Sequence, residues 1–181
     1  MRDTPNPAIN DLDAVIRSSL SSLVSGFSAD NWTGRREREV VSLFCFGHLL
    51  RECRPESFLH DATQISIEVA VPQLTGQIGR TGKSTSKDQV CKDVVIWPGP
   101  RMTCWNSDGK PTVRPICVIE WKHNEGVISG YDVDWLREFS ATAEDFVGYA
   151  VSTNHGGPHN FRLSCTRIHR GEVQFEWLLI R

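Results

Sequence analysis

The chain lacks the features that mark several large classes of protein. Its six cysteines include no Cys-x-x-Cys pair, so neither a zinc-ribbon spacing nor a thioredoxin-type motif is present. It contains no apolar run approaching the ~20 residues of a membrane-crossing helix, and its N-terminus has neither the basic start nor the apolar centre of a secretory signal. We therefore expect a cytoplasmic protein with no membrane partner. Its cysteines are expected to be reduced and to pack as small hydrophobes.

A strong charge of either sign is also missing, because the formal net charge is only −2. This excludes a globally basic nucleic-acid coat. Residues 79–114 are locally basic, however, with seven basic and three acidic side chains. The basic residues are Arg80, Lys83, Lys87, Lys92, Arg101, Lys110 and Arg114. This segment could meet a phosphate-bearing partner, although charge alone favours an ordinary solvated loop.

Three helices are expected from apolar residues that recur every three or four positions. The first has Asn6 as its cap and Gly26 at its end, and its apolar face carries Ile9, Leu12, Ile16, Leu20, Leu23 and Phe27. The second runs from about Arg35 to Cys53, and its inward residues are Val40, Val41, Phe44 and Leu50. The third starts near Asp132 or Asp134 and continues through Val147 and Ala150, stopping at 154–158.

Alternating or uniformly apolar segments between and after these helices predict strands. They cover residues 64–71, 90–97, 116–122, 161–168 and 173–180, with a further short strand at 102–105. The last two form a hairpin that turns at Arg170-Gly171. The expected architecture is one α/β (α+β) domain over residues 1–181. It has a mixed sheet flanked by helices, in the order ααβββαββ.

Acidic and basic side chains stand at the ends of two of these strands. Glu120 and Lys122 end the apolar segment 116–122 two positions apart, so both should project from the same face of the strand. Asp93 opens the apolar run 94–97 on the preceding strand. Because charges buried without partners are costly, these groups are either a structural ion-pair cluster or an active centre. Two carboxylates at one end of adjacent strands would suit Mg²⁺ or Mn²⁺.

The order and spacing of these residues resemble the PD-(D/E)xK nuclease superfamily, which includes restriction endonucleases, Holliday-junction resolvases and phage exonucleases. Asp93 is followed, after 26 intervening residues, by Glu120-x-Lys122. The core order of the superfamily (helix, three strands, helix, strand) matches the order expected over residues 35–169. The N-terminal helix (1–30) and the C-terminal strand (172–181) are then additions to a restriction-endonuclease-like core. Lys92 stands where the proline of the motif would be, a departure that many members share.

The resemblance implies a Mg²⁺- or Mn²⁺-dependent nuclease that hydrolyses the phosphodiester bonds of nucleic acid, with DNA as the expected partner. Asp93, Glu120 and the backbone carbonyl of Trp121 are the implied metal ligands, and Lys122 is the implied catalytic lysine. A homodimer is compatible with the resemblance, because members often work as dimers when two strands must be cut. The alternative is a catalytically inactive nuclease-fold module for binding or assembly, in which the charged residues survive as an ion-pair cluster.

The superfamily often adds a glutamate from the first core helix to the metal site. Glu37 and Glu39 both lie at the start of that expected helix. We prefer Glu37 as a further catalytic and metal-binding residue because it shares a helical face with Val41 and Phe44. The ordinary alternative for both is an acidic first turn that the helix dipole favours.

Two competing motifs are weaker. The loop 76–84 contains Gly82-Lys83-Ser84 but has the wrong spacing for a phosphate-binding loop, and too little chain follows it for the helix that such a loop requires. We therefore interpret it as a basic hairpin tip in which Arg80, Lys83 and Lys87 contact nucleic acid. A zinc site built from cysteine and histidine has no supporting ligand spacing.

Overall fold

The computed structural model describes residues 7–30, 36–72, 89–125, 128, 130–155 and 161–181. A six-stranded mixed sheet is its centre, with the strands lying side by side in chain order. The strands are β1 (Ile65–Pro72), β2 (Gln89–Ile96), β3 (Cys117–His123), β4 (Val147–His155), β5 (Phe161–His169) and β6 (Glu172–Ile180). Strands β3 and β4 are parallel, and every other neighbouring pair is antiparallel. The coarse expectation of a mixed sheet with flanking helices is confirmed.

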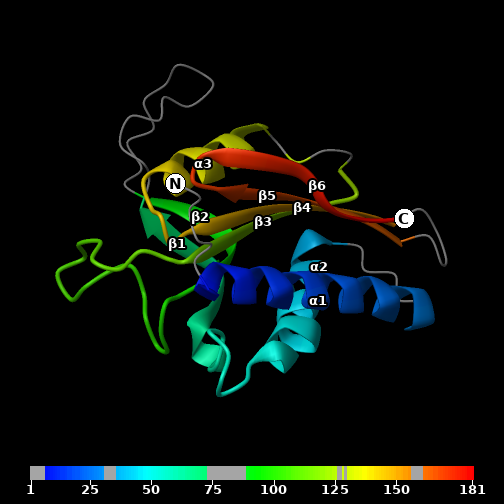
Figure 1. Ribbon diagram of the computed structural model, residues 1–181, viewed down its shortest axis with the longest axis horizontal. Coiled ribbons are helices and arrows are strands. Elements are labelled where there is room, and N and C mark those ends of the chain that lie inside the picture. The colour runs from blue at the N-terminus through cyan, green and yellow to red at the C-terminus, as the bar shows by residue number, and fades with distance from the viewer. Residues whose placement is uncertain (1–6, 31–35, 73–88, 126–127, 129, 156–160) are drawn as a thin grey trace.

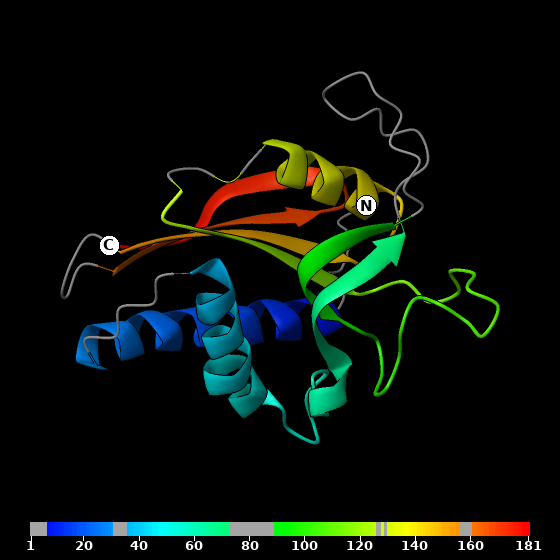
Figure 2. The same ribbon diagram turned by 180° about the vertical axis from the view of Figure 1, so that it is seen from behind.

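Helices cover both faces of this sheet and create two apolar cores (Figure 1). Helix α1 (Pro7–Asp30) and helix α2 (Glu37–Leu43) lie against one face, where Leu12, Leu20 and Val40 are buried with Trp121. Helix α3 (Gly130–Ala141) lies against the other face and buries Trp135. Seen from behind, α2 crosses α1 on the same side of the sheet (Figure 2). No helix in the part that the structure describes is long and apolar enough to cross a membrane.

The first two helices do not end at the residues expected from the sequence. Helix α1 buries the six predicted apolar residues but continues to Asp30, so Gly26 lies within it. The second helix is regular only over α2. It continues as a π-helical turn at Phe44–His48 and a 3₁₀ turn at Leu49–Glu52. A π turn shifts the helical phase, because its hydrogen bonds span one residue more than those of an α-helix. As a result Leu49 is buried, and the expected inward residue Leu50 is only half-buried.

The prediction that the third helix extends through Val147 and Ala150 is wrong. Helix α3 ends at Ala141, and Val147–His155 is the central strand β4, paired with β3 and β5. The element order is therefore ααβββαβββ rather than ααβββαββ. Strand β4 is buried on both faces, so its sequence lacks the alternation that would separate it from a helix. The short strand expected at 102–105 is only an isolated bridge between Trp105 and Pro111.

The C-terminal hairpin was predicted correctly. Arg170 and Gly171 have φ values of 51° and 77°. Two consecutive positive φ values produce the turn that best matches the twist of two paired strands.

The alternation of side chains in strands β1 and β2 is interrupted part-way along their length, so that residues two apart point to opposite faces of the sheet. Ile67 and Val94, which pair with each other, point into the core beneath α1, whereas Val69 and Lys92, the next pair in register, point toward α3. Residues two apart in a regular strand would share a face. The reversal occurs at Glu68, whose φ of 51° is unusual for a residue other than glycine. Asp93 lies between Lys92 and Val94, opposite Glu68, where the alternation is interrupted.

Candidate functional site

The candidate site lies where β2 and β3 separate, and carboxylates occupy the edge of β3 that this separation leaves open. The backbone pairing of the two strands ends at Val94 with Ile119. Beyond it, the backbone N–H of Trp121 donates to Asp93 Oδ2 (2.7 Å) and that of His123 donates to Glu37 Oε2 (3.2 Å). The N–H and C=O of one residue in a strand point to the same side. The carbonyl of Trp121 therefore faces the edge where Asp93 lies.

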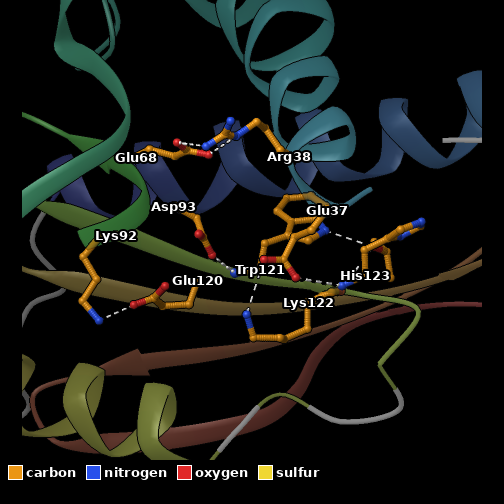
Figure 3. A network of polar contacts seen from close by, with 10 residues as sticks. Glu37, Arg38, Glu68, Lys92, Asp93, Glu120, Trp121, Lys122 and His123 are labelled. Atoms are coloured by element: carbon orange, nitrogen blue, oxygen red, sulfur yellow. Dashed lines mark hydrogen bonds and ion pairs between the residues drawn. The ribbon is translucent and has the colours of Figure 1, made fainter. Parts of the chain in front are cut away.

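Glu120 projects to the α3 face and forms a buried ion pair with Lys92 (Figure 3). The two side chains are 8% and 2% exposed. The Lys92 ammonium also lies 3.9 Å from the centre of the Trp135 ring, a cation–π contact with helix α3. A lysine this deeply buried needs its counter-charge, because an unpaired buried ammonium would be strongly destabilising.

Lys122 forms an ion pair with Glu37 and not with Glu120. Its Nζ lies 3.4 Å from Glu37 Oε1, at the start of helix α2 (Figure 3). Burial lowers the pKa of Lys122, but the negative charges of Glu37, Asp93 and Asp132 outweigh this effect and leave the pKa above its usual value. Lys122 is therefore a fully charged ammonium at neutral pH.

Asp93 and Glu120 influence each other directly. Burial raises the pKa of Glu120 to about 7; the ammonium of Lys92 opposes this shift, and the charge of Asp93 adds to it. Burial also raises the pKa of Asp93, while the Trp121 N–H, the charge of Lys122 and a side-chain hydrogen bond with Glu120 lower it. Burial and the charge of Asp93 thus both make the ionisation of Glu120 less favourable.

Asp132, in the first turn of α3, completes the cluster from the opposite layer. Its charge raises the pKa values of Asp93, Glu120 and Lys122. The cluster thus contains four acidic and two basic side chains, which are Glu37, Asp93, Glu120, Asp132, Lys92 and Lys122. Its negative excess, together with the burial of Asp93 and Glu120, makes the site attractive to a cation.

Comparison of the chain with protein-family models, curated proteins and solved structures found no match. The geometry therefore carries the functional argument. Within the residues that the structure describes, no three histidine, cysteine, aspartate or glutamate side chains are grouped as a metal-binding cage. The candidate oxygen donors are the neighbouring carboxyl groups of Asp93 and Glu120 and, from the strand geometry, the backbone carbonyl of Trp121. This set fits Mg²⁺, which usually keeps several waters and takes one or two protein carboxylates together with substrate phosphates.

Of the residues expected in the site, Glu37, Asp93, Glu120, Trp121 and Lys122 meet at the open edge of β3. Glu37 faces this edge, whereas Glu39 is exposed and its side chain accepts from the backbone N–H of Arg36 at the helix start. The expected nucleic-acid contacts Arg80, Lys83 and Lys87 lie outside the described residues, as does the rejected phosphate-binding loop.

Sequence reasoning missed two members of the cluster. Lys92 was noted as one of the basic residues of segment 79–114 and as a departure from the family motif, and Asp132 only as a helix cap. Regular alternation would place Lys92 on the face opposite Glu120 and Trp135. The interruption of alternation at Glu68 brings it to their face, and the sequence did not indicate this. The available signal for Asp132 was its position at the start of a helix that follows the Glu120-x-Lys122 strand.

Proposed function

We propose that the chain is a Mg²⁺- or Mn²⁺-dependent nuclease with a restriction-endonuclease-like core. The observation that carries this proposal is that the half-buried carboxyl group of Asp93 and the buried carboxyl group of Glu120 lie close enough to perturb each other's pKa, with an ammonium group two residues beyond Glu120. A protein has no structural need to hold two carboxylates together, because their repulsion destabilises the metal-free state. A divalent cation removes that repulsion.

The topology supports the same proposal. Helix α2, strands β1 to β3, helix α3 and strand β4 follow one another in the core order of the PD-(D/E)xK superfamily. Strands β1 to β3 form an antiparallel meander, and α3 then crosses the sheet so that β4 lies parallel to β3. Strands β5 and β6 and helix α1 would be additions to that core, which enlarges the addition expected from the sequence by one strand.

In this proposal the residues of the edge have separate roles. Asp93, Glu120 and the Trp121 carbonyl would hold the cation, and Glu37 would add its negative charge from the start of α2. The bound cation supplies charge neutralisation and a lower pKa for an attacking water. Lys122 orients that water or stabilises the negative charge that develops on the phosphate. Glu37 holds the Lys122 ammonium in position by the ion pair described above.

The test is cleavage of supercoiled plasmid, linear duplex and single-stranded DNA in Mg²⁺, Mn²⁺ or EDTA. Lys122→Ala should lower the rate about 10²- to 10³-fold, the usual effect of removing one group that stabilises transition-state charge. Arg51→Ala removes an exposed basic side chain from the 3₁₀ turn after α2, outside the basic segment 79–114; it is the matched control and should behave as the wild type. No cleavage by the wild type, or equal cleavage by the wild type and Lys122→Ala, would refute the proposal.

One observation favours the second candidate, an inactive nuclease-fold module for binding or assembly. Glu120 is already paired with Lys92, so an internal ammonium occupies part of the place that a metal ion would take. In that case the cluster would be purely structural. The two candidates differ in whether divalent cations stabilise the folded protein, because only a metal site in the native state links metal concentration to stability.

A further inference from the structure

A cavity of about 440 Å³ adjoins the candidate site on the α3 face of the sheet. Its floor carries the hydroxyl groups of Ser152, Ser164 and Thr166 from β4 and β5, and its outer wall includes Phe175 and Glu176 of β6. The first turns of α3 form the remaining wall, which includes Asp134. A mainly apolar cavity with a few polar groups is the usual form of a site for a small planar ligand.

The strand register connects this cavity to the residues of the candidate site. Lys122 pairs with Ser152, and Ser152 pairs with Ser164, so the three residues form one row across β3, β4 and β5. Glu120, Ala150 and Thr166 form the next row. Neighbouring strands are about 4.8 Å apart, which places Ser164 about 10 Å from Lys122 along the row. A nucleotide whose phosphate lies at Lys122 can place its base in the cavity.

A bulge in β6 forms the outer wall. Between the pairs Cys165–Leu178 and Arg167–Gln174, four steps along β6 match only two along β5. Glu176 has a φ of 50° within this bulge. Successive residues of a regular strand point to opposite faces, whereas here both Phe175 and Glu176 line the cavity. Phe175 is 72% exposed, which is unusual for a large apolar residue.

The chemistry of the walls selects the part of a nucleotide that would enter. The carboxylates of Asp134 and Glu176 repel a phosphate, but they can accept hydrogen bonds from the amino groups of a base. An exposed aromatic ring offers a stacking surface for any base. Hydroxyl groups on the floor can donate or accept. These features suit a base edge and face and do not suit the sugar–phosphate backbone.

We propose that this cavity binds an unpaired nucleobase next to the cleaved phosphate, so that the substrate is single-stranded or locally opened nucleic acid. The proposal rests on the nuclease function above and specifies its substrate class. A base inside an intact duplex is stacked on both faces and paired along one edge, and it could not enter the cavity without first being extruded.

The test measures binding in EDTA, where no metal-dependent cleavage occurs, by fluorescence anisotropy of a labelled single-stranded oligonucleotide. A second oligonucleotide of equal length and charge has abasic sites in place of its central bases. The wild type should bind the abasic strand about 5- to 100-fold more weakly. Phe175→Ala should lose affinity for the normal strand by a similar factor and leave binding of the abasic strand unchanged. Phe175→Tyr keeps the ring and should retain the affinity.

The matched control is Phe46→Ala, which removes another exposed phenylalanine (67% exposed) from the helical segment after α2, on the opposite side of the sheet. It should bind both strands as the wild type does. Equal affinity of the wild type for both strands, or an unchanged affinity of Phe175→Ala, would overturn the cavity proposal even if plasmid is cleaved. Failure of the wild type to cleave any DNA refutes the nuclease function instead, so the two failures are distinguishable.

Discussion

At the scale of single residues, the site contains more buried charged side chains than a protein interior usually does. Lys92 and Glu120 are almost completely buried, and the Glu120 carboxyl also faces Asp93. An ammonium group between a carboxylate and the Trp135 ring is stable only while its counter-charge remains. Lys92 therefore holds the cluster together in the metal-free protein, and Glu120 balances attraction by Lys92 against repulsion by Asp93.

The first prediction concerns the pH dependence of stability. The pKa of Glu120 is about 7 in the folded protein against an ordinary value of 4.5, so between these pH values the folded state binds more protons than the unfolded state. Stability should therefore fall as pH rises from 4.5 through 7, by about 3 kcal/mol from this group. Urea unfolding in EDTA at pH 5 to 8 measures it. Glu120→Gln should show a flatter profile; parallel profiles for the two proteins would contradict the prediction.

The second prediction concerns Lys92. Lys92→Met keeps an unbranched side chain, one atom shorter, but leaves Glu120 buried without its ammonium, which should lower the free energy of unfolding at pH 8 by about 3–5 kcal/mol. The double variant Lys92→Met/Glu120→Gln removes both charges and should recover much of that loss. The control pair is Arg137 with Asp134 in α3, whose side chains are 50% and 51% exposed, and its removal should change stability by less than about 1 kcal/mol. Additive losses in the Lys92/Glu120 cycle would show that the two side chains do not interact.

At the scale of secondary structure elements, the sequence predicted those whose apolar pattern is regular. Helix α1 and the β5–β6 hairpin were located closely because one has a clear helical period and the other has a glycine-containing turn. Strand β4 was missed because a fully buried strand and a buried helix have the same uniformly apolar sequence. The positive φ of Glu68 left no trace in residue type, so the faces of Lys92 and Asp93 could not be inferred from alternation.

The third prediction tests the face of α2 that points to the site. Glu37→Gln removes the charge opposite Lys122 while an amide oxygen can still accept from the His123 N–H. It should weaken Mg²⁺ binding, measured by calorimetry, and leave the fold intact. Glu39→Gln is the matched control from the same helical turn, where the side chain is exposed and accepts from the backbone N–H of Arg36, so it should leave metal binding unchanged. A larger effect at Glu39 than at Glu37 would reverse the proposed roles of the two residues.

The fourth prediction tests the packing of α3 on strand β4. A Cβ atom at Gly148 would lie 2.9 Å from the Leu136 side chain of α3, closer than packed atoms allow. Gly148→Ala should therefore destabilise the protein by about 1–3 kcal/mol in urea unfolding. The matched control is Gly26→Ala within α1, where the nearest contact of the new atom is an ordinary 3.5 Å from His48. Helix propensity should make that variant about 0.5–1 kcal/mol more stable. Equal effects of the two substitutions would argue against the observed α3–β4 contact.

At the scale of the whole molecule, three layers meet at one edge of β3. Glu37 comes from the helical layer on one side of the sheet, Asp132 from α3 on the other, and Asp93 and Lys122 from the sheet itself. The central strands are buried, whereas the side chains of Lys122 and Glu37, where β2 leaves β3, are 25% and 33% exposed. Because all three layers contribute to the site, a change in its charge should change the stability of the entire fold.

The last prediction uses that connection to separate a nuclease from an inert module before any substrate is known. A metal ion at 100 times its Kd that binds only the folded state adds about 2.7 kcal/mol of stability, or a rise in Tm of roughly 5–10 °C for a chain of this size. Wild type should show such a rise with millimolar Mg²⁺ or Mn²⁺, and Lys122→Ala should keep it, because that residue acts on the substrate and not on the metal. Asp93→Asn and Glu120→Gln should lose the rise, since each removes a ligand charge. Ca²⁺ and an equal ionic strength of NaCl distinguish a divalent site from general screening. If the Tm of the wild type is indifferent to both metals, the cluster is the ion-pair core of a binding module, and the nuclease proposal fails.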